Sequence, residues 1–310
     1  MVSRIAVVGS NMTDLITYGQ RMPVAGETLE ARQFVVGRGG KGANQAVAAA
    51  RLGAKVAMIG RVGEDEFGRE TRHSLQENGI DITHVLPTAG VMTGVAPIFV
   101  ADSGENCILI VKGANSHVLP ADIKAAHETL LNCDLILLQL EIPLETVYAT
   151  IEWAHQHGRR VLLNPAPAST ELALERIASV DYFVPNQTEL AILTNMPTAT
   201  VAEVELAANC LLQRGMRQII VTLGADGVLL VTQAGARHIP SIVVAARDTT
   251  GAGDAFIGAF AFYETAGYQL EAALHKAVAY AALSVTAEGT QTSFATHEVF
   301  QDFLTQHSTK

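Results

Sequence analysis

The sequence has 310 residues, which suits one large α/β domain with a small appendage and allows a sizeable hydrophobic core. Hydrophobic residues make up 49% of it and charged residues 17%, and no apolar run approaches the roughly 18 residues of a membrane helix. A net charge of −10 disfavours nucleic acid or an anionic membrane as a partner, so any phosphate site has to be built locally.

The N-terminus and the cysteines indicate the compartment. Residues 1–9 form a short strand-like run without the longer apolar core and cleavage site of a signal peptide, so we expect a cytoplasmic protein. Cys107, Cys133 and Cys210 are scattered in apolar contexts that are typical of core thiols. We therefore expect neither disulfide bonds nor a zinc site.

The first 36 residues predict extended structure. Residues 4–8 predict a buried strand and residues 14–18 a second one, followed by a turn at 22–27 and another extended segment at 28–36. Asp14 is costly to bury unless something hydrogen-bonds it, and a polar ligand would serve.

Residues 37–44, Gly-Arg-Gly-Gly-Lys-Gly-Ala-Asn, run into an alanine-rich helix predicted for residues 45–52. Such a glycine cluster lets the backbone approach a small ligand, with Lys41 and Asn44 projecting from the same turn. Glycines 37, 39 and 42 also fit the dinucleotide fingerprint, with Glu64 or Asp65 as its acid. This alternative is weak because the first strong strand is already used at residues 4–8. The segment is not a Walker loop either, since the G-x-x-x-x-G-K spacing is absent.

The next segment predicts an amphipathic helix at 65–78 and a hairpin of residues 94–101 and 105–111, joined by 102–105. Together with the extended segments of residues 14–36, the hairpin could form a small antiparallel sheet that serves as a lid. The alternative, that these strands extend the core sheet, is equally compatible with the sequence.

From residue 120 onward, helices and strands alternate. We expect helices at 121–131, 144–157, 171–178 and 201–214, and strands at 134–140, 161–163, 182–184 and 218–222. Alternation of this kind indicates βαβ units and a parallel sheet whose ligands bind outside the carboxyl ends of the strands. Polar or glycine residues follow these strands at 139–141, 164–167, 185–189 and 222–227, which predicts one site edge.

Residues 248–254, Asp-Thr-Thr-Gly-Ala-Gly-Asp, open directly into an apolar helix-length run at 255–262. Unpaired N–H groups and the helix dipole would make this loop an anion cradle. Asp254 lies where the cradle meets the helix, so its carboxylate could take a proton beside a bound phosphoryl group. The alternative is that Asp254 is an ordinary acid in a first helical turn and that the glycines form only a turn.

Four motifs, in the same order along the chain, together resemble the motifs of a known protein family. Residues 39–44 and 248–254, with Asn186-x-x-Glu189 and Thr222-x-Gly-x-x-Gly227 between them, resemble the ribokinase (PfkB-type) family of sugar kinases, and the match extends from residue 9 to residue 293. The resemblance implies a doubly wound, mainly parallel α/β sheet flanked by helices, in one domain of residues 1–310. It also implies a small β lid, for which we expect segments of about 12–36 and 93–112.

The resemblance further implies an ATP-dependent kinase that phosphorylates a primary sugar hydroxyl with Mg²⁺, and the roles below are expectations from it. The catalytic set is Asp254 as base, with Gly251, Ala252 and Gly253 as anion hole. The sugar set is Met12, Asp14, Gly39, Gly40, Lys41, Asn44, Glu141 and Asp254. The ATP set is Asn186, Thr222, Gly224, Gly227 and Gly253, with Asn186 and Glu189 holding Mg²⁺ through water.

The resemblance also implies activation by a monovalent cation, and hard oxygen ligands suit K⁺. The expected ligands, largely backbone carbonyls with one carboxylate, are Asp248, Thr250, Ser284, Ala287, Gly289 and Ser293. Many relatives carry a basic side chain at the position of Ala287, so only carbonyl ligation is possible there. We also expect a homodimer formed through the lid sheet.

Residues 9–14, Gly-Ser-Asn-Met-Thr-Asp, depart from the family pattern Gly-Ser-x-Asn-x-Asp by placing Met12 where a sugar-binding Asn is usual. A thioether fills space but makes no good hydrogen bond to a sugar hydroxyl. We therefore expect phosphorylation of the 5-hydroxyl of 2-deoxy-D-ribose, with ribose used less well. The alternatives are a ribose kinase or a nucleoside kinase of the same family, and, from other classes, an NAD-dependent oxidoreductase or a catalytically idle sugar-binding regulator. Plain core packing of Met12 remains the simpler interpretation of that residue alone.

Overall fold

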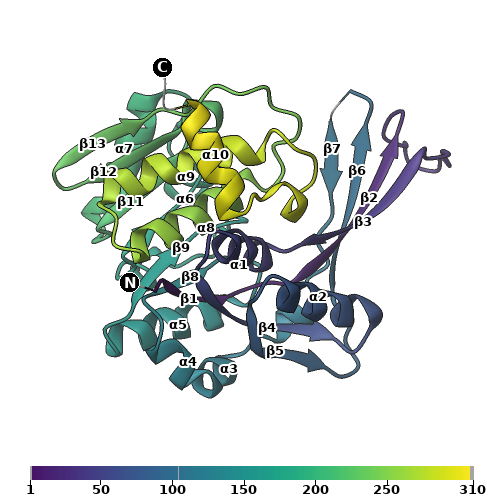
Figure 1. Ribbon diagram of the computed structural model, residues 1–310, viewed down its shortest axis with the longest axis horizontal. Coiled ribbons are helices and arrows are strands. Elements are labelled where there is room, and N and C mark those ends of the chain that lie inside the picture. The colour runs from purple at the N-terminus through teal and green to yellow at the C-terminus, as the bar shows by residue number, and fades with distance from the viewer. Residues whose placement is uncertain (1, 104, 308–310) are drawn as a thin grey trace.

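The fold of this chain, known from a computed structural model that describes residues 2–103 and 105–307, contains a large and a small β-sheet (Figure 1). The order of strands in the large sheet is β13-β12-β11-β10-β9-β8-β1-β4-β5, and all pairings from β11 to β5 are parallel. The doubly wound, mainly parallel sheet predicted from the sequence is therefore confirmed. Its strands are β1 (Arg4–Val8), β4 (Lys55–Gly63), β5 (Asp81–Thr88), β8 (Leu135–Leu138), β9 (Arg160–Leu163), β10 (Tyr182–Phe183), β11 (Gln218–Thr222), β12 (Val228–Thr232) and β13 (Gly235–Ile239).

Helices cover both faces of the large sheet, and each face has its own hydrophobic core. The helices that pack into the first core are α1 (Lys41–Arg51), α2 (Glu66–Glu77), α8 (Ala252–Thr265), α9 (Leu270–Ser284) and α10 (His297–His307). Those of the second core are α3 (Pro120–Ala125), α4 (His127–Leu131), α5 (Leu144–Gln156), α6 (Gln187–Thr194) and α7 (Val201–Gln213). Short 3-10 helices are η1 (Gly113–His117), η2 (Leu174–Arg176), η3 (Gly224–Asp226) and η4 (Gln291–Ser293).

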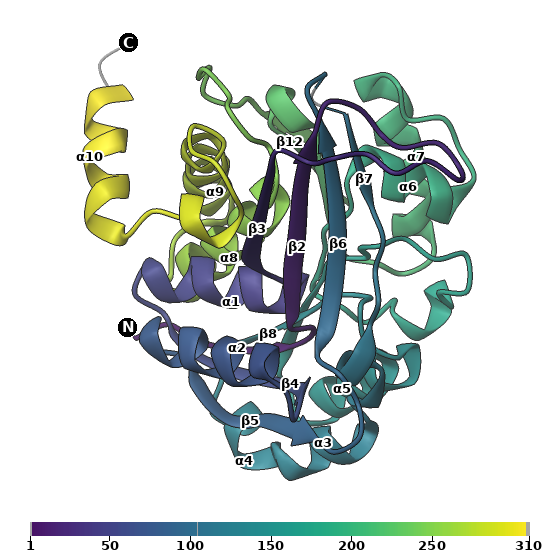
Figure 2. The same ribbon diagram turned by 90° about the vertical axis from the view of Figure 1, so that its right-hand side faces the viewer.

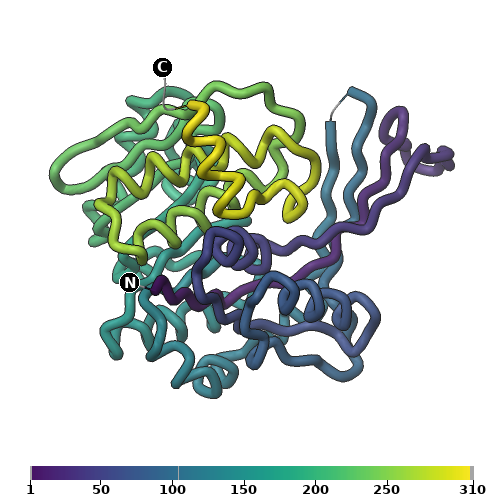
Figure 3. Tube along the Cα trace, viewed as in Figure 1, coloured from purple at the N-terminus to yellow at the C-terminus, as the bar shows by residue number. Residues whose placement is uncertain are grey.

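The small sheet, which we call the lid sheet, has the order β3-β2-β6-β7 and stands apart from the large sheet (Figures 1 and 2). Its strands are β2 (Met12–Gly19), β3 (Gln33–Gly39), β6 (Gly94–Ala101) and β7 (Asn106–Ile108). The chain enters it twice, once before α1 and again after β5, as the trace in Figure 3 shows. The alternative that these strands extend the core sheet is therefore wrong.

The lid sheet is mixed, whereas the sequence suggested an antiparallel sheet. The β2–β3 and β6–β7 pairs are antiparallel, but β2 and β6 are parallel. Between these two strands the chain passes through α1, β4, α2 and β5 of the body, and a crossover of that length can return in the same direction. Of the predicted β6–β7 turn, residue 104 lies outside the described residues.

Several predicted elements need correction. The helix expected at 45–52 begins at Lys41, and the one expected at 121–131 bends at Ala126, where ψ is 12°. Only η2 forms where a helix was expected at 171–178, and just before it the N–H of Ala173 donates to the Tyr148 hydroxyl at 2.8 Å. Cys107 is exposed on the lid sheet, so the expectation of a core thiol is wrong there.

The strand order identifies where a ligand should bind. From β1 the chain builds outward to β4 and β5, then returns to place β8 on the other side of β1. In open α/β sheets the crevice at such a reversal, outside the carboxyl ends of the strands, is the usual binding site. No helix of the described residues is long and apolar enough to span a membrane.

Candidate active site

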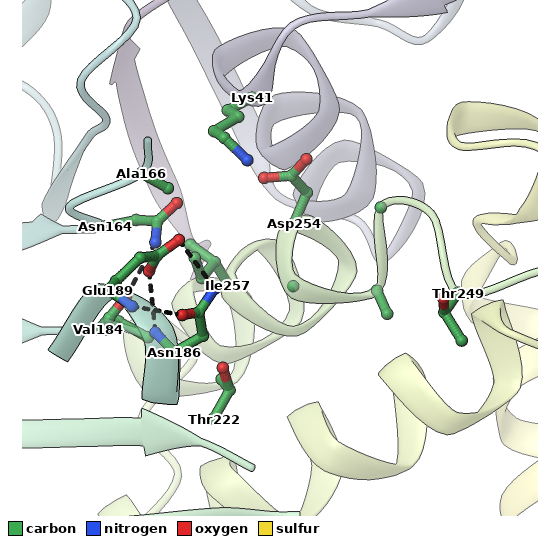
Figure 4. A pocket seen from close by; sticks show the side chains of 13 residues that line it. Lys41, Asn164, Ala166, Val184, Asn186, Glu189, Thr222, Thr249, Asp254 and Ile257 are labelled. Atoms are coloured by element: carbon green, nitrogen blue, oxygen red, sulfur yellow. Dashed lines mark hydrogen bonds between the residues drawn. The ribbon is translucent and has the colours of Figure 1, made fainter. Parts of the chain in front are cut away.

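A pocket of about 190 Å³ lies at the carboxyl ends of the central strands (Figure 4). It is bordered by the start of α1, the ends of β9, β10 and β11, and the loop that leads into α8. The residues that line it are Lys41, Asn164, Ala166, Val184, Asn186, Glu189, Thr222, Thr249, Gly251, Ala252, Gly253, Asp254 and Ile257. The pocket thus joins the predicted anion hole and base to part of the predicted ATP set.

The N-terminus of α8 has the geometry of an anion cradle. Gly251 caps the helix with φ of 79°, and a Cβ there would lie 2.4 Å from Cγ2 of Thr290, so this position requires glycine. Among the described residues, the N–H groups of Gly253 and Asp254 meet no backbone or side-chain acceptor. These N–H groups, together with the helix dipole, favour an anion at this end of the pocket.

Asp254 is buried in the first turn of α8, and two carboxamides hold its carboxylate. Asn44 Nδ2 donates to Oδ2 at 2.9 Å, and Gln45 Nε2 donates to Oδ1 at 3.0 Å. The Lys41 side chain points toward the same carboxylate in Figure 4. Burial alone would lower the pKa of Lys41, but the negative charges of Asp254, Glu141 and Glu189 outweigh it and raise that pKa. Lys41 is therefore held as a cation beside the cradle.

Glu141 lies at the reversal of strand order, just beyond β8. Its Oε2 accepts hydrogen bonds from the Ser10 hydroxyl, which follows β1, and from the backbone N–H of Lys41 at 2.9 Å. Glu141 is 4% exposed, so it is not the solvent-facing surface acid that a strand end could also carry. It ties the two strand ends to the start of α1.

Asp14 reaches the same region from the lid sheet. It pairs with Gly37 of β3 and Ala96 of β6, and its carboxylate lies against Gly39, where a Cβ would be 2.5 Å from Cγ of Asp14. Burial raises the pKa of Asp14 from 3.8 to about 6, and the charges of Glu141 and then Asp254 add to the effect. The lid sheet therefore carries an acid that is poorly stabilised in its ionised form.

This shift has a consequence for stability that can be measured. The folded state holds the Asp14 proton more tightly than the unfolded state, so the free energy of unfolding falls as pH rises from about 4 to about 6. The shift from 3.8 to about 6 corresponds to roughly 3 kcal/mol. We expect Asp14→Asn to be more stable than the wild type at pH 7 and to lose this advantage near pH 4, as followed by urea unfolding. An equal difference between the two proteins at both pH values would contradict the assignment.

Met12 begins β2 and lies on the same strand face as Asp14, since side chains alternate along a strand. It is 2% exposed and pairs with Gly39 and Gly94, two residues without side chains. The carboxamide of Asn115 fixes the strand here by exchanging hydrogen bonds of 2.9 and 2.8 Å with the backbone of Asn11. Met12 is therefore rigidly placed next to the predicted sugar contacts.

Asn186 and Glu189 are linked at the start of α6. They form a capping box in which the Asn186 side chain accepts the N–H of Glu189 and the Glu189 carboxylate accepts the N–H of Asn186. Thr222 is bridged to Asn186, so the ends of β10 and β11 meet here. Burial raises the pKa of Glu189, although the N–H of Asn186 and the charge of Lys41 oppose that shift. The carboxylate faces the pocket and could still hold the water shell of a hard cation.

Gly224 and Gly227 lie in the turn after β11 and do not line the pocket. The N–H of Leu223 donates a hydrogen bond to the carbonyl of Gly227 at 2.8 Å, and this bond closes the turn beside Thr222. The predicted ATP set is thus split between the pocket itself and the neighbouring turn.

The predicted cation ligands lie on the loop before α8 and the segment from the end of α9 to η4. Burial alone would raise the pKa of Asp248, but the N–H groups of Thr250 and Gly289, at 2.9 and 2.8 Å from its oxygens, hold that pKa below its usual value. Ser284 and Ser293 are buried, and their hydroxyls donate to nearby carbonyls. The N–H of Ala287 donates to the carbonyl of Ser284, and no backbone N–H of the described residues donates to the carbonyl of Ala287. Asp248 therefore joins the two segments.

The sequence placed Gln139 and Asn164 at the predicted site edge, but it did not indicate that buried amides form a hydrogen-bonded network around Asp254. Gln45, Gln139, Asn164 and Gln291 are all at least nine-tenths buried, and they hydrogen-bond to one another, to Asp254 or to Asn44. A signal in the sequence could have revealed this network, because uncharged polar residues occur there inside otherwise apolar runs. Such residues are expected to be buried, and buried amides must find hydrogen-bond partners.

The dinucleotide interpretation of the first glycine cluster is wrong. Gly37 and Gly39 lie in β3 of the lid sheet, and no βα turn of the large sheet contains them. Asp65, the proposed acid, instead caps α2 by accepting the N–H of Gly68 at 2.8 Å.

Comparisons with known proteins agree with this geometry. Residues 2–297 match the family described as pfkB family carbohydrate kinase. The chain is 52% identical over 300 residues to the deoxyribokinase of Salmonella typhi, covering 97% of this chain and 98% of that protein. It is 40% identical over 294 residues to the ribokinase of Mus musculus, covering 94% and 91%. The structure of Arabidopsis thaliana ribokinase complexed with ribose and ATP superposes with a TM-score of 0.90 at 32% identity, covering 98% of this chain and 99% of that one.

Proposed function

Since the chain belongs to the pfkB family of carbohydrate kinases, we propose that it transfers the γ-phosphoryl group of ATP to the 5-hydroxyl of 2-deoxy-D-ribose and uses ribose less well. The observation that carries the choice of sugar is the buried Met12 on the strand face of Asp14. The 52% identity to a deoxyribokinase over nearly the whole chain supports the same choice.

The reaction places each group of the pocket in a role. Asp254 accepts the proton of the 5-hydroxyl as that oxygen attacks the γ-phosphorus, and the bond from phosphorus to the bridging oxygen of ADP breaks. The N–H groups at Gly253 and Asp254 stabilise the charge on the equatorial oxygens, and Lys41, whose side chain points toward the Asp254 carboxylate, adds positive charge nearby. Asn186 and Glu189 would hold the water shell of Mg²⁺, which neutralises phosphate charge when it is bound.

Discrimination between the two pentoses follows from hydrogen bonding. With Met12 near C2 of the sugar, a ribose 2-hydroxyl would be buried without a good partner, which costs roughly 1–3 kcal/mol. The CH₂ of 2-deoxyribose has no such need. Because apolar pockets reject an added hydroxyl by only about 10²-fold, the preference should be partial.

The test is a panel of pentoses, hexoses and nucleosides with ATP and Mg²⁺, with each phosphorylated product identified by NMR. We expect 2-deoxyribose 5-phosphate as the fastest product and ribose 5-phosphate as the second. A nucleoside as the best acceptor would refute the proposal.

Ribose as the main substrate is the second candidate, because several relatives are ribokinases. A nucleoside substrate is disfavoured by the lid sheet, where Ala96 and Ile98 lie on the face of Asp14. Neither offers an aromatic ring on which a base could stack.

A monovalent cation is proposed at the loops joined by Asp248, with backbone carbonyls as its other ligands. The loop of residues 248–251 carries the N-cap of α8, so a cation there would order the anion cradle without touching substrate. We expect K⁺ to raise kcat several-fold over a large organic cation at matched ionic strength. Equal rates with the two cations would rule this site out.

A homodimer is proposed through the face of the lid sheet that points away from Asp14. Phe34 and Phe99 both pair with Thr17, so they share one face, and Val36 lies on it two residues further along β3. These three apolar side chains are 59%, 40% and 46% exposed. A patch of this kind marks an interaction surface, and a second copy of the sheet would cover it.

The dimer can be tested by sedimentation velocity. We expect the wild type to sediment as a dimer and Phe34→Glu as a monomer, because the charge would have to be buried in the interface. Leu206→Glu on α7, which replaces another exposed apolar side chain, serves as the control and should remain dimeric. A monomeric wild type, or a dimeric Phe34→Glu, would contradict the proposal. The cytoplasmic location expected from the sequence stays a prediction.

A further inference from the structure

We infer that Gln45 is a positioning residue, which orients the Asp254 carboxylate from outside the substrate pocket and is itself fixed by Gln139. The inference rests on the proposed phosphoryl transfer and adds a group to it. Gln45 belongs to α1, and Gln139 directly follows β8. Both side chains are fully buried, with exposed fractions of 0%, so neither can touch a sugar or a nucleotide.

The direction of each hydrogen bond in this chain is dictated by the carboxylate. An ionised Asp254 only accepts, so Gln45 must turn its NH₂ group toward Oδ1, at 3.0 Å. The Gln45 carbonyl oxygen then faces the other way and accepts from Gln139 Nε2 at 2.6 Å. The second N–H of Gln45 reaches Oδ1 of Asn164 at 3.3 Å. Gln45 therefore has one orientation that satisfies all three neighbours.

A second chain of amides reaches the other oxygen of the carboxylate. Gln291 Nε2 donates to Oδ1 of Asn44 at 3.0 Å, and Asn44 Nδ2 donates to Oδ2 of Asp254 at 2.9 Å. With one donor on each oxygen, rotation about the Cβ–Cγ bond of Asp254 would break at least one buried hydrogen bond. The remaining lone pairs are left to the incoming hydroxyl.

Removal of the Gln45 donor should therefore disturb the chemical step more than binding. The carboxylate would be held only through Asn44 and could rotate about that bond. Small misplacements of a reacting group lower rates by factors of up to about 10². Apart from Asp254 itself, the contacts predicted for the sugar and for ATP would stay in place.

The experiment measures three variants: Gln45→Met, Gln139→Met and the double variant that combines these two changes. Gln218→Met is the control. Each protein is assayed by steady-state kinetics with 2-deoxyribose, ATP and Mg²⁺ and by thermal unfolding. Methionine keeps the volume and removes the donor. Gln218 begins β11, at the end of the strand away from the pocket, and its Oε1 has no partner among the described residues, so it is a matched control. We expect Gln45→Met to lower kcat at least about tenfold with both KM values within about threefold.

The double variant separates positioning from stability. In Gln45→Met, the buried Nε2 of Gln139 loses its acceptor and Tm falls, whereas Gln45→Met/Gln139→Met removes that orphan donor and should regain Tm. We expect kcat to stay low in the double variant, because the carboxylate still lacks its donor. A kcat that recovers together with Tm would overturn the inference and make Gln45 a structural residue.

A last comparison uses the Asp254→Asn background. If Gln45 acts only through the carboxylate, Gln45→Met should lower the residual rate of Asp254→Asn by less than about twofold, whereas a further tenfold loss would overturn the inference. An active wild type whose kcat is unaffected by Gln45→Met would refute the positioning role alone. A wild type that phosphorylates no sugar would refute both this role and the proposed function.

Discussion

Asp254→Asn is expected to lower kcat by at least about 10²-fold while the affinity for the sugar changes only a few-fold, as is usual when a general base is lost. The amide cannot accept the hydroxyl proton. It also offers a single acceptor oxygen to two donors, Asn44 and Gln45, so one of them will lack its partner. We therefore expect a modest decrease in Tm. For this reason kcat should be measured at a temperature well below the Tm of the variant.

The matched control is Asp302→Asn, which makes the same chemical change on an exposed residue of α10 and should leave kcat unchanged. Sugar affinity is measured separately by calorimetry, so that binding and turnover are not confused. Near wild-type turnover in Asp254→Asn would remove this residue from the mechanism.

Met12→Asn is expected to shift the ratio of kcat/KM values toward ribose by roughly 10- to 100-fold, the effect of one good hydrogen bond to a buried hydroxyl. Asparagine at the start of β2 would offer both a donor and an acceptor on the strand face of Asp14. With 2-deoxyribose the same amide would face only CH₂, so activity on this sugar should fall.

Met12→Leu is the matched control, because it changes the shape of the side chain but adds no hydrogen-bonding group. It should retain the preference for 2-deoxyribose. If Met12→Asn and Met12→Leu change the ratio alike, Met12 acts through packing and the choice of sugar is made elsewhere.

Local patterns sufficed to predict the backbone of the site. Glycines directly before an apolar, helix-length run allow the positive φ and the exposed N–H groups of a helix start, and the loop at residues 248–254 forms the helix N-terminus that its sequence indicated. The alternation of strands and helices after residue 120 likewise indicated the parallel sheet and the edge where ligands bind.

The hydrogen bonds within the site were beyond such patterns. Gln45 lies 209 residues from Asp254 in the sequence, and no local propensity links the two. Asn186-x-x-Glu189 fits a capping box as well as a nucleotide motif, and the structure shows the cap directly. The parallel β2–β6 pair also depends on a long crossover through the body, which strand patterns do not encode.

The central claim, phosphoryl transfer to 2-deoxyribose in preference to ribose, is tested most directly by competition. Equal concentrations of the two sugars are incubated with a limiting amount of ATP and excess Mg²⁺, and the ratio of the two 5-phosphates then equals the ratio of kcat/KM values. We predict that 2-deoxyribose 5-phosphate is the main product. A majority of ribose 5-phosphate would contradict the account and make ribose the preferred acceptor.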